Sequence, residues 1–478
     1  MAIGVTSRRD GRTDPDAAPV SRWAVPVILI GSFLPAADSH VVNVALPTIG
    51  ADLGAGPAAL QLVVAGYMVA YACLLVLGGR LGDRVGRRRL FVAGMAAFAL
   101  ASVVCGLAPN AGTLIAGRMV QGVTAALMVP QVLATVYATL HGPARDRALG
   151  VFGAMVGGAT IAGQLLGGLV VSADVAGLQW RPIFLINVPV CVIGVLAATR
   201  VVPESRAERP LPIDRPGTVL LTVAVVGLLL PATLGRDTGW PPWTFVSLAV
   251  AVLAAIVFVR VERRLERAGG APLVAPSLVR VPAVAWGLTT SVLFFTAVGA
   301  YLFVLAVSLQ SGLGFGPLES ALVIAPYALG YLTVSLTIGR AVRRFGARRV
   351  VMTGAVALAV VHLLAAVQLA AAYPSLTFFS AIPFSVLVGA GQGVVMIPMY
   401  GAVMAGVPAD GVGVTSGMLT TTQQTGLAAG VSVLGGVFFL AVGAAAGVAD
   451  WQRGTVVAFV GMAVLALAGA LTARKLPH

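Results

Sequence analysis

Fourteen long apolar stretches constrain the fold of this chain more than any other feature. A helix that crosses a lipid bilayer needs about 20 mostly apolar residues. The stretches that meet this length are 23–46, 58–78, 90–108, 112–138, 148–172, 182–201, 217–235, 243–261, 284–310, 319–339, 350–371, 376–406, 412–441 and 454–473. The bilayer core offers no water to the backbone, and such long, uniformly apolar stretches do not suit barrel strands. The sequence therefore predicts an all-α integral membrane protein with 14 transmembrane helices.

The composition of the chain agrees with this fold class. Only 10% of the 478 residues are charged and 58% are hydrophobic, whereas a soluble domain carries about 25% charged residues. The net charge of +14 would also fit a nucleic-acid-binding protein, but the basic residues form short clusters between apolar stretches. We therefore expect membrane lipid and no nucleic acid as a partner. The cysteines, Cys73, Cys105 and Cys191, lie within apolar stretches and have neither disulfide nor metal-site spacing.

The positions of the basic residues predict the orientation of the chain. If the N-terminus lies in the cytoplasm, 27 of the 31 basic residues fall in cytoplasmic loops and tails. Arg181, Arg236 and Arg453 then lie outside, and Arg118 lies within the fourth stretch. Cytoplasmic loops are enriched in Lys and Arg, so we expect a bacterial cytoplasmic (inner) membrane protein with both termini in the cytoplasm. Residues 1–22 lack the apolar core and cleavage site of a signal peptide.

An internal repeat divides the chain into two similar parts. Residues 79–89 read GRLGDRVGRRR and residues 339–349 read GRAVRRFGARR, with six identities at an offset of 260. The tripeptide QGV also recurs, at 121–123 and 392–394. The abundance of Gly and Arg in cytoplasmic turns is the alternative explanation, but both segments join the second and third helices of a six-helix unit. Two such halves with a substrate between them form a transporter architecture.

These features predict the domain organisation. The segments are a cytoplasmic tail at 1–22, a six-helix bundle at 23–202, a linker at 203–216, an inserted helix pair at 217–261, a linker at 262–283, a second six-helix bundle at 284–473 and a tail at 474–478.

Asp38 is the one acidic residue that lies deep inside a predicted span. A carboxylate in the bilayer core costs at least about 2.5 kcal/mol. Two explanations remain open: a structural carboxylate bonded to a neighbouring helix, or a proton carrier that alternates between environments. We favour the proton carrier, because membrane-embedded acids are functional as a rule. Arg118 is the expected partner, as a static ion pair or as part of the coupling. His40 points to the opposite side of the helix from Asp38, and His362 is interpreted as a core or cavity-wall residue.

Polar and aromatic side chains in the middle of the spans are candidates to line a substrate cavity. They are Asn43, Gln121, Gln164, Tyr301, Gln310, Gln392, Gln423 and Gln424. Each can instead bond to a neighbouring helix, and the sequence does not rank them. Val298 occupies the position that corresponds to Asp38 in the second half. A cavity with one carboxylate is expected to suit neutral or singly charged amphiphiles better than dications.

Several motifs resemble those of a known family. GRLGDRVGRRRL, which begins at Gly79, resembles the loop motif of the major facilitator superfamily, and Arg118 with Gln121 and Gly122 resembles its fourth-helix pattern. The fourteen spans, DSHVVNVALP in the first span and WRPIFLINVP in the sixth are similar to the fourteen-helix drug:proton antiporter family. The resemblance covers essentially the whole chain. It implies the major facilitator fold, with two six-helix bundles and two inserted central helices.

The resemblance also implies a conformational role for the loop motif. Its residues are Gly79, Asp83, Arg84, Gly86, Arg87 and Arg88. Asp83 is expected to lie against the N-terminus of the thirteenth helix, near 412–416, where the helix dipole favours a carboxylate. This contact would close the cytoplasmic side. A solvated charge cluster that sets the topology also fits Arg87 and Arg88.

One motif departs from the family pattern. The fifth helix usually carries G-P-x-x-G-G, but residues 163–168 read GQLLGG, so Gln164 replaces the proline. Without proline, this helix lacks the residue that most often causes a sharp kink. The glycines Gly163, Gly167 and Gly168 still permit close helix contact.

Together, these features predict a multidrug-resistance type of exporter rather than an enzyme. The expected activity is proton-coupled antiport of hydrophobic or amphiphilic small molecules such as drugs or antibiotics, by alternating access. Such a protein needs a proton gradient but no cofactor or metal, and we expect it to function as a monomer. The alternatives are a dedicated natural-product or lipid exporter, an integral-membrane enzyme and a sensor. An enzyme lacks support from any nucleophile–base set at membrane depth, and a sensor has no need of Asp38, Asp83 and Arg118.

Overall fold

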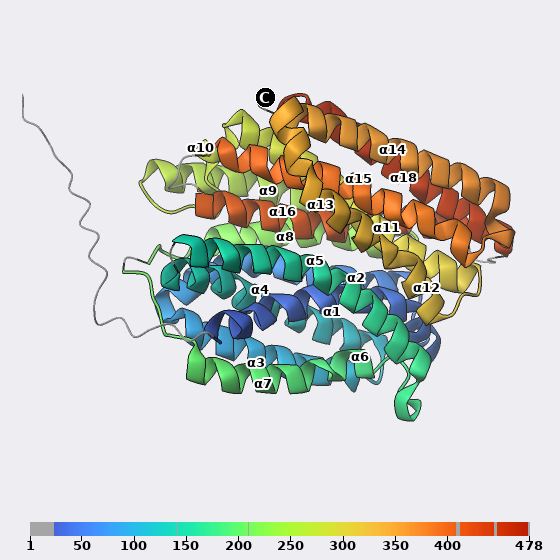
Figure 1. The fold of residues 1–478 in the computed structure, drawn as a ribbon, viewed down its shortest axis with the longest axis horizontal. Helices are drawn as coiled ribbons and strands as arrows, with labels where there is room; N and C mark the ends of the chain where they lie inside the picture. The colour runs from blue at the N-terminus through green and yellow to red at the C-terminus, as the bar shows by residue number, and fades with distance from the viewer. Residues whose placement is uncertain (1–22, 141, 209, 408–411, 444–446, 477–478) are drawn as a thin grey trace, which may run out of the picture.

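The computed structural model describes residues 23–476 except 141, 209, 408–411 and 444–446 (Figure 1). Within these ranges the chain forms helices joined by short loops, and no strand is present. The predicted all-α class is therefore confirmed.

The first half of the chain forms seven α-helices. They are α1 (Ala24–Leu53), α2 (Pro57–Val85), α3 (Arg87–Gly106), α4 (Ala111–Thr139), α5 (Gly142–Ala173), α6 (Pro182–Leu185) and α7 (Asn187–Val201), with a short 3-10 helix η1 (Val175–Gly177) before α6. The short α6 continues almost directly into α7, so the two together make one membrane-length segment, Pro182–Val201.

The remaining helices form the inserted pair and the second half. They are α8 (Arg215–Leu234), α9 (Pro242–Arg267), α10 (Pro276–Val279), α11 (Pro282–Val307), η2 (Ser308–Gly312), α12 (Pro317–Ile324), α13 (Pro326–Phe345), α14 (Ala347–Ala372), η3 (Tyr373–Ser375), α15 (Phe378–Ala405), α16 (Val412–Ala429), η4 (Gly430–Leu434), α17 (Gly435–Val442) and α18 (Val448–Ala473). Several spans are assembled from consecutive pieces, such as α12 with α13 and α16 with η4 and α17.

A helix covers each of the fourteen predicted apolar stretches. Thirteen segments in the described residues are long and apolar enough to cross a membrane. The predicted span 148–172 lies in α5, which runs for 32 residues, and its apolar segment among the described residues, Gly158–Ala173, is shorter than those thirteen. Many helices extend beyond the predicted apolar stretches, and α9 continues to Arg267 rather than ending at 261. Helical hydrogen bonds do not require lipid, so charged turns continue the helices and shorten the linkers.

The internal repeat is visible in the backbone. Gly86 ends α2 and Gly346 ends α13, and both have positive φ angles, of 118° and 80°. Such angles favour glycine, which has no Cβ to clash. The same turn therefore joins the second and third helices of each half, as the similarity between 79–89 and 339–349 predicts.

Glycines also allow equivalent helix pairs to pack closely in the two halves. A Cβ at Gly122 of α4 would collide with the carbonyl oxygen of Tyr67 in α2. In the second half, a Cβ at Gly389 of α15 would collide with the carbonyl oxygen of Tyr327 in α13. Close backbone approach at small residues is how helices associate without a hydrophobic driving force in lipid.

The two halves lie side by side, with α8 along their boundary (Figure 1). We call the end of the molecule with loops 83–89, 202–214 and 268–281 the basic end, and the opposite end the α12 end. At the α12 end, Gln310 Nε2 donates to the carbonyl oxygen of Val44 over 2.9 Å. Nearby, the backbone N–H of Leu318 donates to Ser172 Oγ over 3.0 Å. These contacts join the halves at the α12 end.

Candidate functional site

Asp38 lies at the centre of a buried polar cluster in the first half. Its Oδ2 atom accepts a hydrogen bond and forms an ion pair with Arg118 Nη1 of α4. Its Oδ1 atom accepts from Asn187 Nδ2 of α7 over 2.7 Å and from Gln121 Nε2 of α4 over 3.4 Å. Asp38 is 1% exposed and Arg118 is fully buried. Donors from two helices therefore surround the carboxylate, and this arrangement fits its ionised form.

Arg118 has further partners besides Asp38. Its Nε donates to the carbonyl oxygen of Val63 in α2 over 3.2 Å, and its Nη1 donates to Gln121 Oε1 over 2.9 Å. The guanidinium carbon lies 4.4 Å from the centre of the Tyr67 ring and 5.7 Å from that of Phe184. These cation–π and hydrogen-bond contacts would hold Arg118 in place if Asp38 lost its charge.

The cluster continues into α3 through Ser102. Gln121 Nε2 donates to Ser102 Oγ over 2.9 Å, and Asn187 Nδ2 lies 3.5 Å from the same oxygen. Cys105 Sγ, one turn further along α3, is 3.4 Å from Gln121 Oε1. Side chains of α1, α3, α4 and α7 thus form one connected network, with the α2 backbone attached through Arg118. A network of this kind fixes the helices relative to one another.

The structure brings together some of the predicted residues and adds others. The predicted pairing of Asp38 with Arg118 is present in the geometry. Gln121, predicted as a cavity residue, is a fully buried member of the carboxylate network. Asn187 and Ser102 were missed. Asn187 falls within the WRPIFLINVP motif, so a sequence signal existed for it, whereas none distinguished Ser102.

Several polar atoms of α1 and α5 are buried without a partner among the described residues. Asn43 Oδ1, His40 Nδ1 and both amide atoms of Gln164 are buried without a hydrogen-bond partner in the described structure. The adjacent Gly163 lies against His40, because a Cβ there would be 3.1 Å from His40 Cβ. Buried polar groups are rarely left unsatisfied. Two of the predicted cavity residues, Asn43 and Gln164, therefore retain the capacity to bond to a guest molecule.

The other predicted cavity residues have different surroundings. Gln310 bonds across to Val44 of the first half. Within the second half, the Tyr301 hydroxyl lies 3.1 Å from Ser385 Oγ, and Gln423 Oε1 accepts from the hydroxyl of Tyr400 over 3.1 Å. Two predicted residues complete the set: Gln392, which accepts from the hydroxyl of Tyr327, and Gln424, which is half-buried in α16. Whether any of them contacts a substrate stays a prediction.

The glycines of the fifth helix make the close contacts that the sequence predicts. A Cβ at Gly167 would lie 2.8 Å from the carbonyl oxygen of Val41 in α1. A Cβ at the next residue, Gly168, would lie 3.0 Å from Leu318 Cα in α12 of the other half. The GQLLGG segment therefore touches both halves of the molecule at the α12 end.

The loop motif packs against the linker that follows α7. Asp83 Oδ1 pairs with Arg87 Nη2 over 2.8 Å within the loop. The backbone N–H of Arg88 donates to Glu204 Oε1 over 3.2 Å, and a Cβ at Gly86 would lie 2.6 Å from the same oxygen. The predicted contact of Asp83 with 412–416 adjoins residues 408–411, which lie outside the described ranges, and it stays a prediction.

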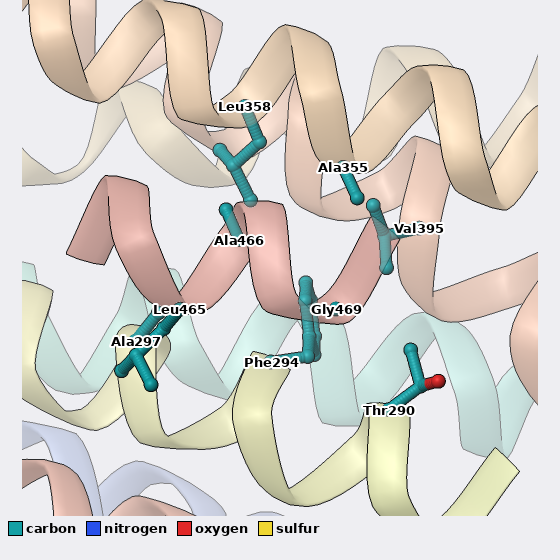
Figure 2. Close-up of a pocket in the computed structure, with 9 residues that line it drawn as sticks. All are labelled: Thr290, Phe294, Ala297, Ala355, Leu358, Val395, Leu465, Ala466 and Gly469. Carbon is teal, nitrogen blue, oxygen red and sulfur yellow. The ribbon is translucent and has the colours of Figure 1, made fainter. Parts of the chain in front are cut away.

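A small apolar cavity lies inside the second half (Figure 2). Its walls come from α11, α14, α15 and α18, with Thr290, Phe294, Leu358, Val395 and Gly469 among them. Its volume of about 10 Å³ leaves room for about one water molecule. It is remote from the carboxylate network, which lies in the first half, and it is far too small for an organic substrate. We interpret it as a packing gap.

The described residues therefore combine a buried ion pair with a tightly packed two-half helical bundle. Comparison with known proteins shows which family has this arrangement. The profile of the Major Facilitator Superfamily matches residues 28–431. The chain belongs to this superfamily. The predicted family and fold are thereby confirmed.

Similar proteins indicate what kind of superfamily member this chain is. The probable actinorhodin transporter of Streptomyces coelicolor is 37% identical over 428 residues, which cover 89% of this chain and 74% of the relative. The cephamycin export protein CmcT of Amycolatopsis lactamdurans is 35% identical, covering 98% and 95%. The puromycin resistance protein pur8 of Streptomyces alboniger is 33% identical, covering 86% and 80%. This superfamily member is thus a membrane transporter related to bacterial antibiotic exporters.

Solved structures agree on the fold. The POT family transporter PepTSo superposes with a TM-score of 0.69 at 15% identity, over 95% of this chain and 97% of that one. A D-xylose-proton symporter superposes with a TM-score of 0.66 at 14% identity, over 95% and 97%. At these identities the likeness concerns the fold alone.

Proposed function

We propose that this transporter exports hydrophobic or amphiphilic organic molecules from a bacterial cytoplasm in exchange for protons. The basic end then faces the cytoplasm and the α12 end faces outward across the inner membrane, in keeping with the distribution of Lys and Arg. The observation that carries the proposal is the Asp38–Arg118 pair, buried among membrane-length helices. Ionisable residues in such positions mark proton and substrate pathways.

The surroundings of Asp38 suit reversible protonation. When a proton neutralises Asp38, Arg118 retains the Val63 carbonyl, Gln121 Oε1 and the Tyr67 ring. The guanidinium is then not left unpaired, which keeps the free-energy cost of the protonated state down. When the proton leaves, Arg118 and Asn187 bind the carboxylate again. The same side chains therefore serve both states of the cycle.

The position of Asp38 on α1 links its protonation to movement of the two halves. Val44, whose carbonyl binds Gln310 of the second half, lies six residues after Asp38, or about 9 Å along the helix. Because Asp38 is 1% exposed, a proton reaches it only after the helices move. Opening of the α12 end separates α1 from α11 and creates that access, so proton entry and alternating access occur together.

The unpartnered atoms of Asn43 and Gln164 suggest the class of substrate. A molecule with an apolar body and a few polar groups would satisfy these amide atoms when it lies between the halves. One nearby carboxylate suits neutral or singly charged compounds. The names of the relatives, which include actinorhodin, cephamycin and puromycin, support export of antibiotic-like natural products.

Flux measurements in proteoliposomes test this function. The purified protein is reconstituted, a pH gradient is imposed, and the uptake of puromycin, a cephamycin and actinorhodin is followed. We expect accumulation of at least one compound against its gradient in wild type, and none in Asp38→Asn. Asp52→Asn is the matched control, because Asp52 pairs with Arg181 at the α12 end and not in the network. Uphill transport by Asp38→Asn would show that Asp38 is structural.

The breadth of the transported panel separates the two exporter types. Transport of chemically different compounds indicates a multidrug exporter, whereas transport of one compound indicates a dedicated natural-product exporter. Absence of proton-driven transport of every compound in the panel would contradict the proposal for this antibiotic class.

A further inference from the structure

A second buried charge cluster lies at the basic end, away from Asp38. Arg80 of α2, Asp214 at the start of α8 and Glu262 of α9 are 6%, 5% and 1% exposed. Arg80 Nη1 donates to the carbonyl oxygens of Pro212 over 3.0 Å and Ala271 over 2.8 Å. Its Nη2 atom donates to the carbonyl oxygen of Pro272. One guanidinium therefore holds both loops that flank the α8–α9 pair against the end of α2.

The two carboxyl groups bind backbone N–H groups of the same region. Asp214 Oδ1 accepts from Gly217 over 2.8 Å, and Oδ2 accepts from Leu273 over 3.2 Å. Glu262 Oε2 accepts from the backbone N–H of Val274 over 2.8 Å. The carboxyls thus hold loop 271–274 onto α8 and α9.

Three of the four carboxyl oxygens of Asp214 and Glu262 thus accept hydrogen bonds from backbone N–H groups, and the fourth does not. Glu262 Oε1 is buried, and no hydrogen-bond partner for it is present among the described residues. A Cβ at Gly217 would collide with both Asp214 Oδ2 and Glu262 Oε1. These two oxygens therefore converge on the same point above Gly217, where two ionised carboxylates would repel each other at close range.

A single proton between the two oxygens resolves both difficulties. It removes the like-charge repulsion, and it gives Glu262 Oε1 a hydrogen bond. From α2, the charged side chain that faces the pair is Arg80. The charged side chains that α8 and α9 contribute are Asp214 and Glu262 themselves. Loop 271–274, with the sequence APLV, contributes backbone groups only. With one proton bound, the pair carries one negative charge, which balances Arg80.

We propose that Asp214 and Glu262 form a proton-binding site at the basic end, and that the bound proton fastens loop 271–274 and the α8–α9 pair to α2. This site is separate from Asp38, and the proposal does not depend on antiport. Loss of the proton places two negative charges above Gly217. Loop 271–274 then loosens as the pH rises.

Hydrogen–deuterium exchange on the purified full-length protein in detergent tests the site. The readout is the protection factor of the segment containing Leu273 and Val274, which is corrected for the intrinsic effect of pH. In wild type we expect this factor to fall about tenfold from mildly acidic to alkaline pH. Glu262→Gln retains an acceptor for Val274 and supplies an N–H for Asp214, so its protection should stay high across the range.

Two control variants locate the effect. Glu266→Gln changes a half-buried carboxylate of the same helix, which binds Ser277, and should keep the wild-type pH dependence. Asp38→Asn should keep it too, which separates this proton from the transport site. The proposal is overturned if protection in wild type does not change with pH, or if Glu262→Gln responds to pH as wild type does.

Infrared spectroscopy provides a measurement that needs no variant of the cluster. Asp38→Asn protein should show a protonated carboxyl band at neutral pH that disappears at alkaline pH. Absence of that band at neutral pH would overturn the proposal, whatever the folding of Glu262→Gln.

Discussion

The side chains around Asp38 illustrate how a charge can be held inside a membrane protein. Burial of an ion pair is costly, and the pair persists only where additional hydrogen bonds satisfy both partners. Here Asn187 and Gln121 donate hydrogen bonds to the carboxylate. The guanidinium donates to the Val63 carbonyl and lies over the Tyr67 ring. Removal of Arg118 alone should therefore cost more stability than removal of both charges.

A double-mutant cycle tests this balance. Arg118→Gln leaves Asp38 as an uncompensated buried carboxylate and should lower the free energy of unfolding by about 3–5 kcal/mol. The double variant Asp38→Asn/Arg118→Gln should recover a large part of that loss. Denaturant unfolding in detergent measures both values. If Arg118→Gln and the double variant are equally stable, that result would contradict a charged Asp38 in this conformation.

Asn187 and Asn43 should have separable roles. Asn187→Ala removes the 2.7 Å hydrogen bond to Asp38, so we expect proton-driven transport to fall several-fold with little change in substrate affinity. Asn43→Ala removes an amide whose oxygen is unpartnered, so we expect weaker substrate binding with proton coupling retained. Initial rates at varied substrate concentration and varied pH gradient measure both. The same kinetic defect in both variants would contradict the division.

How far the sequence predicts this site depends on the residue. Asp38 and Arg118 could be found because a charge within an apolar stretch is conspicuous. Ser102 could not be ranked, because Ser occurs in many spans. Asn187 lies in the WRPIFLINVP motif, but the importance of both side chains arises from the crossing of α3, α4 and α7. Gln121 was predicted as a polar residue of the interior, but only the packing shows that it faces the ion pair.

At the level of helices, glycine determines which pairs approach closely. Gly168 permits contact between α5 and α12, which belong to different halves. Because this contact lies at the α12 end, we expect it to help to keep that end closed. Gly158 lies on the same helix, but among the described residues a Cβ there would meet no atom of a neighbouring helix within 4 Å.

These two glycines provide a matched test of closure. Gly168→Leu should separate α5 from α12 and expose the α12 end, whereas Gly158→Leu should not. A cysteine introduced at Val44, which is fully buried, would report opening by its rate of maleimide labelling. We expect labelling to rise about tenfold or more in Gly168→Leu, since loss of about 1.4 kcal/mol from the closed state suffices. Equal labelling in the two variants would show that this contact does not control the gate.

The repeat provides a second matched pair, at Arg80 and Arg340. Both occupy the same place in the repeated loop segment, but Arg80 is buried among backbone carbonyls whereas Arg340 is exposed. Arg80→Ala should free the loops around 212 and 271–272 and increase their hydrogen–deuterium exchange. Arg340→Ala should leave exchange in its own segment close to wild type. Similar effects of the two substitutions would contradict a specific role for Arg80.

The helix ends were less predictable than the helices themselves. Apolar stretches mark the part of a helix inside the bilayer, so α2 and α9 both extend beyond their predicted limits. The attachment of both linkers to Arg80 could not be inferred from the sequence at all. Its acceptors are backbone carbonyls, which every residue possesses and no motif identifies.

On the scale of the whole molecule, the two halves of this superfamily member differ in chemistry despite their shared fold. The first half carries the ion pair, whereas Val298 occupies the corresponding place in the second half, within an apolar and aromatic interior. The main contacts between the halves are those of α2 with α16, α5 with α12 and α1 with α11. This architecture could be predicted from the sequence, because the internal repeat and the basic loops can be recognised without knowledge of any contact.

Substrate-induced proton release from purified protein in detergent tests the central claim, that Asp38 carries the coupling proton. The probe is the compound that the flux assay identifies, added to weakly buffered protein with a pH indicator. We predict release from wild type and from Asp52→Asn, and none from Asp38→Asn at substrate concentrations that saturate binding. Proton release by Asp38→Asn equal to that of wild type would contradict the account and place the coupling group elsewhere.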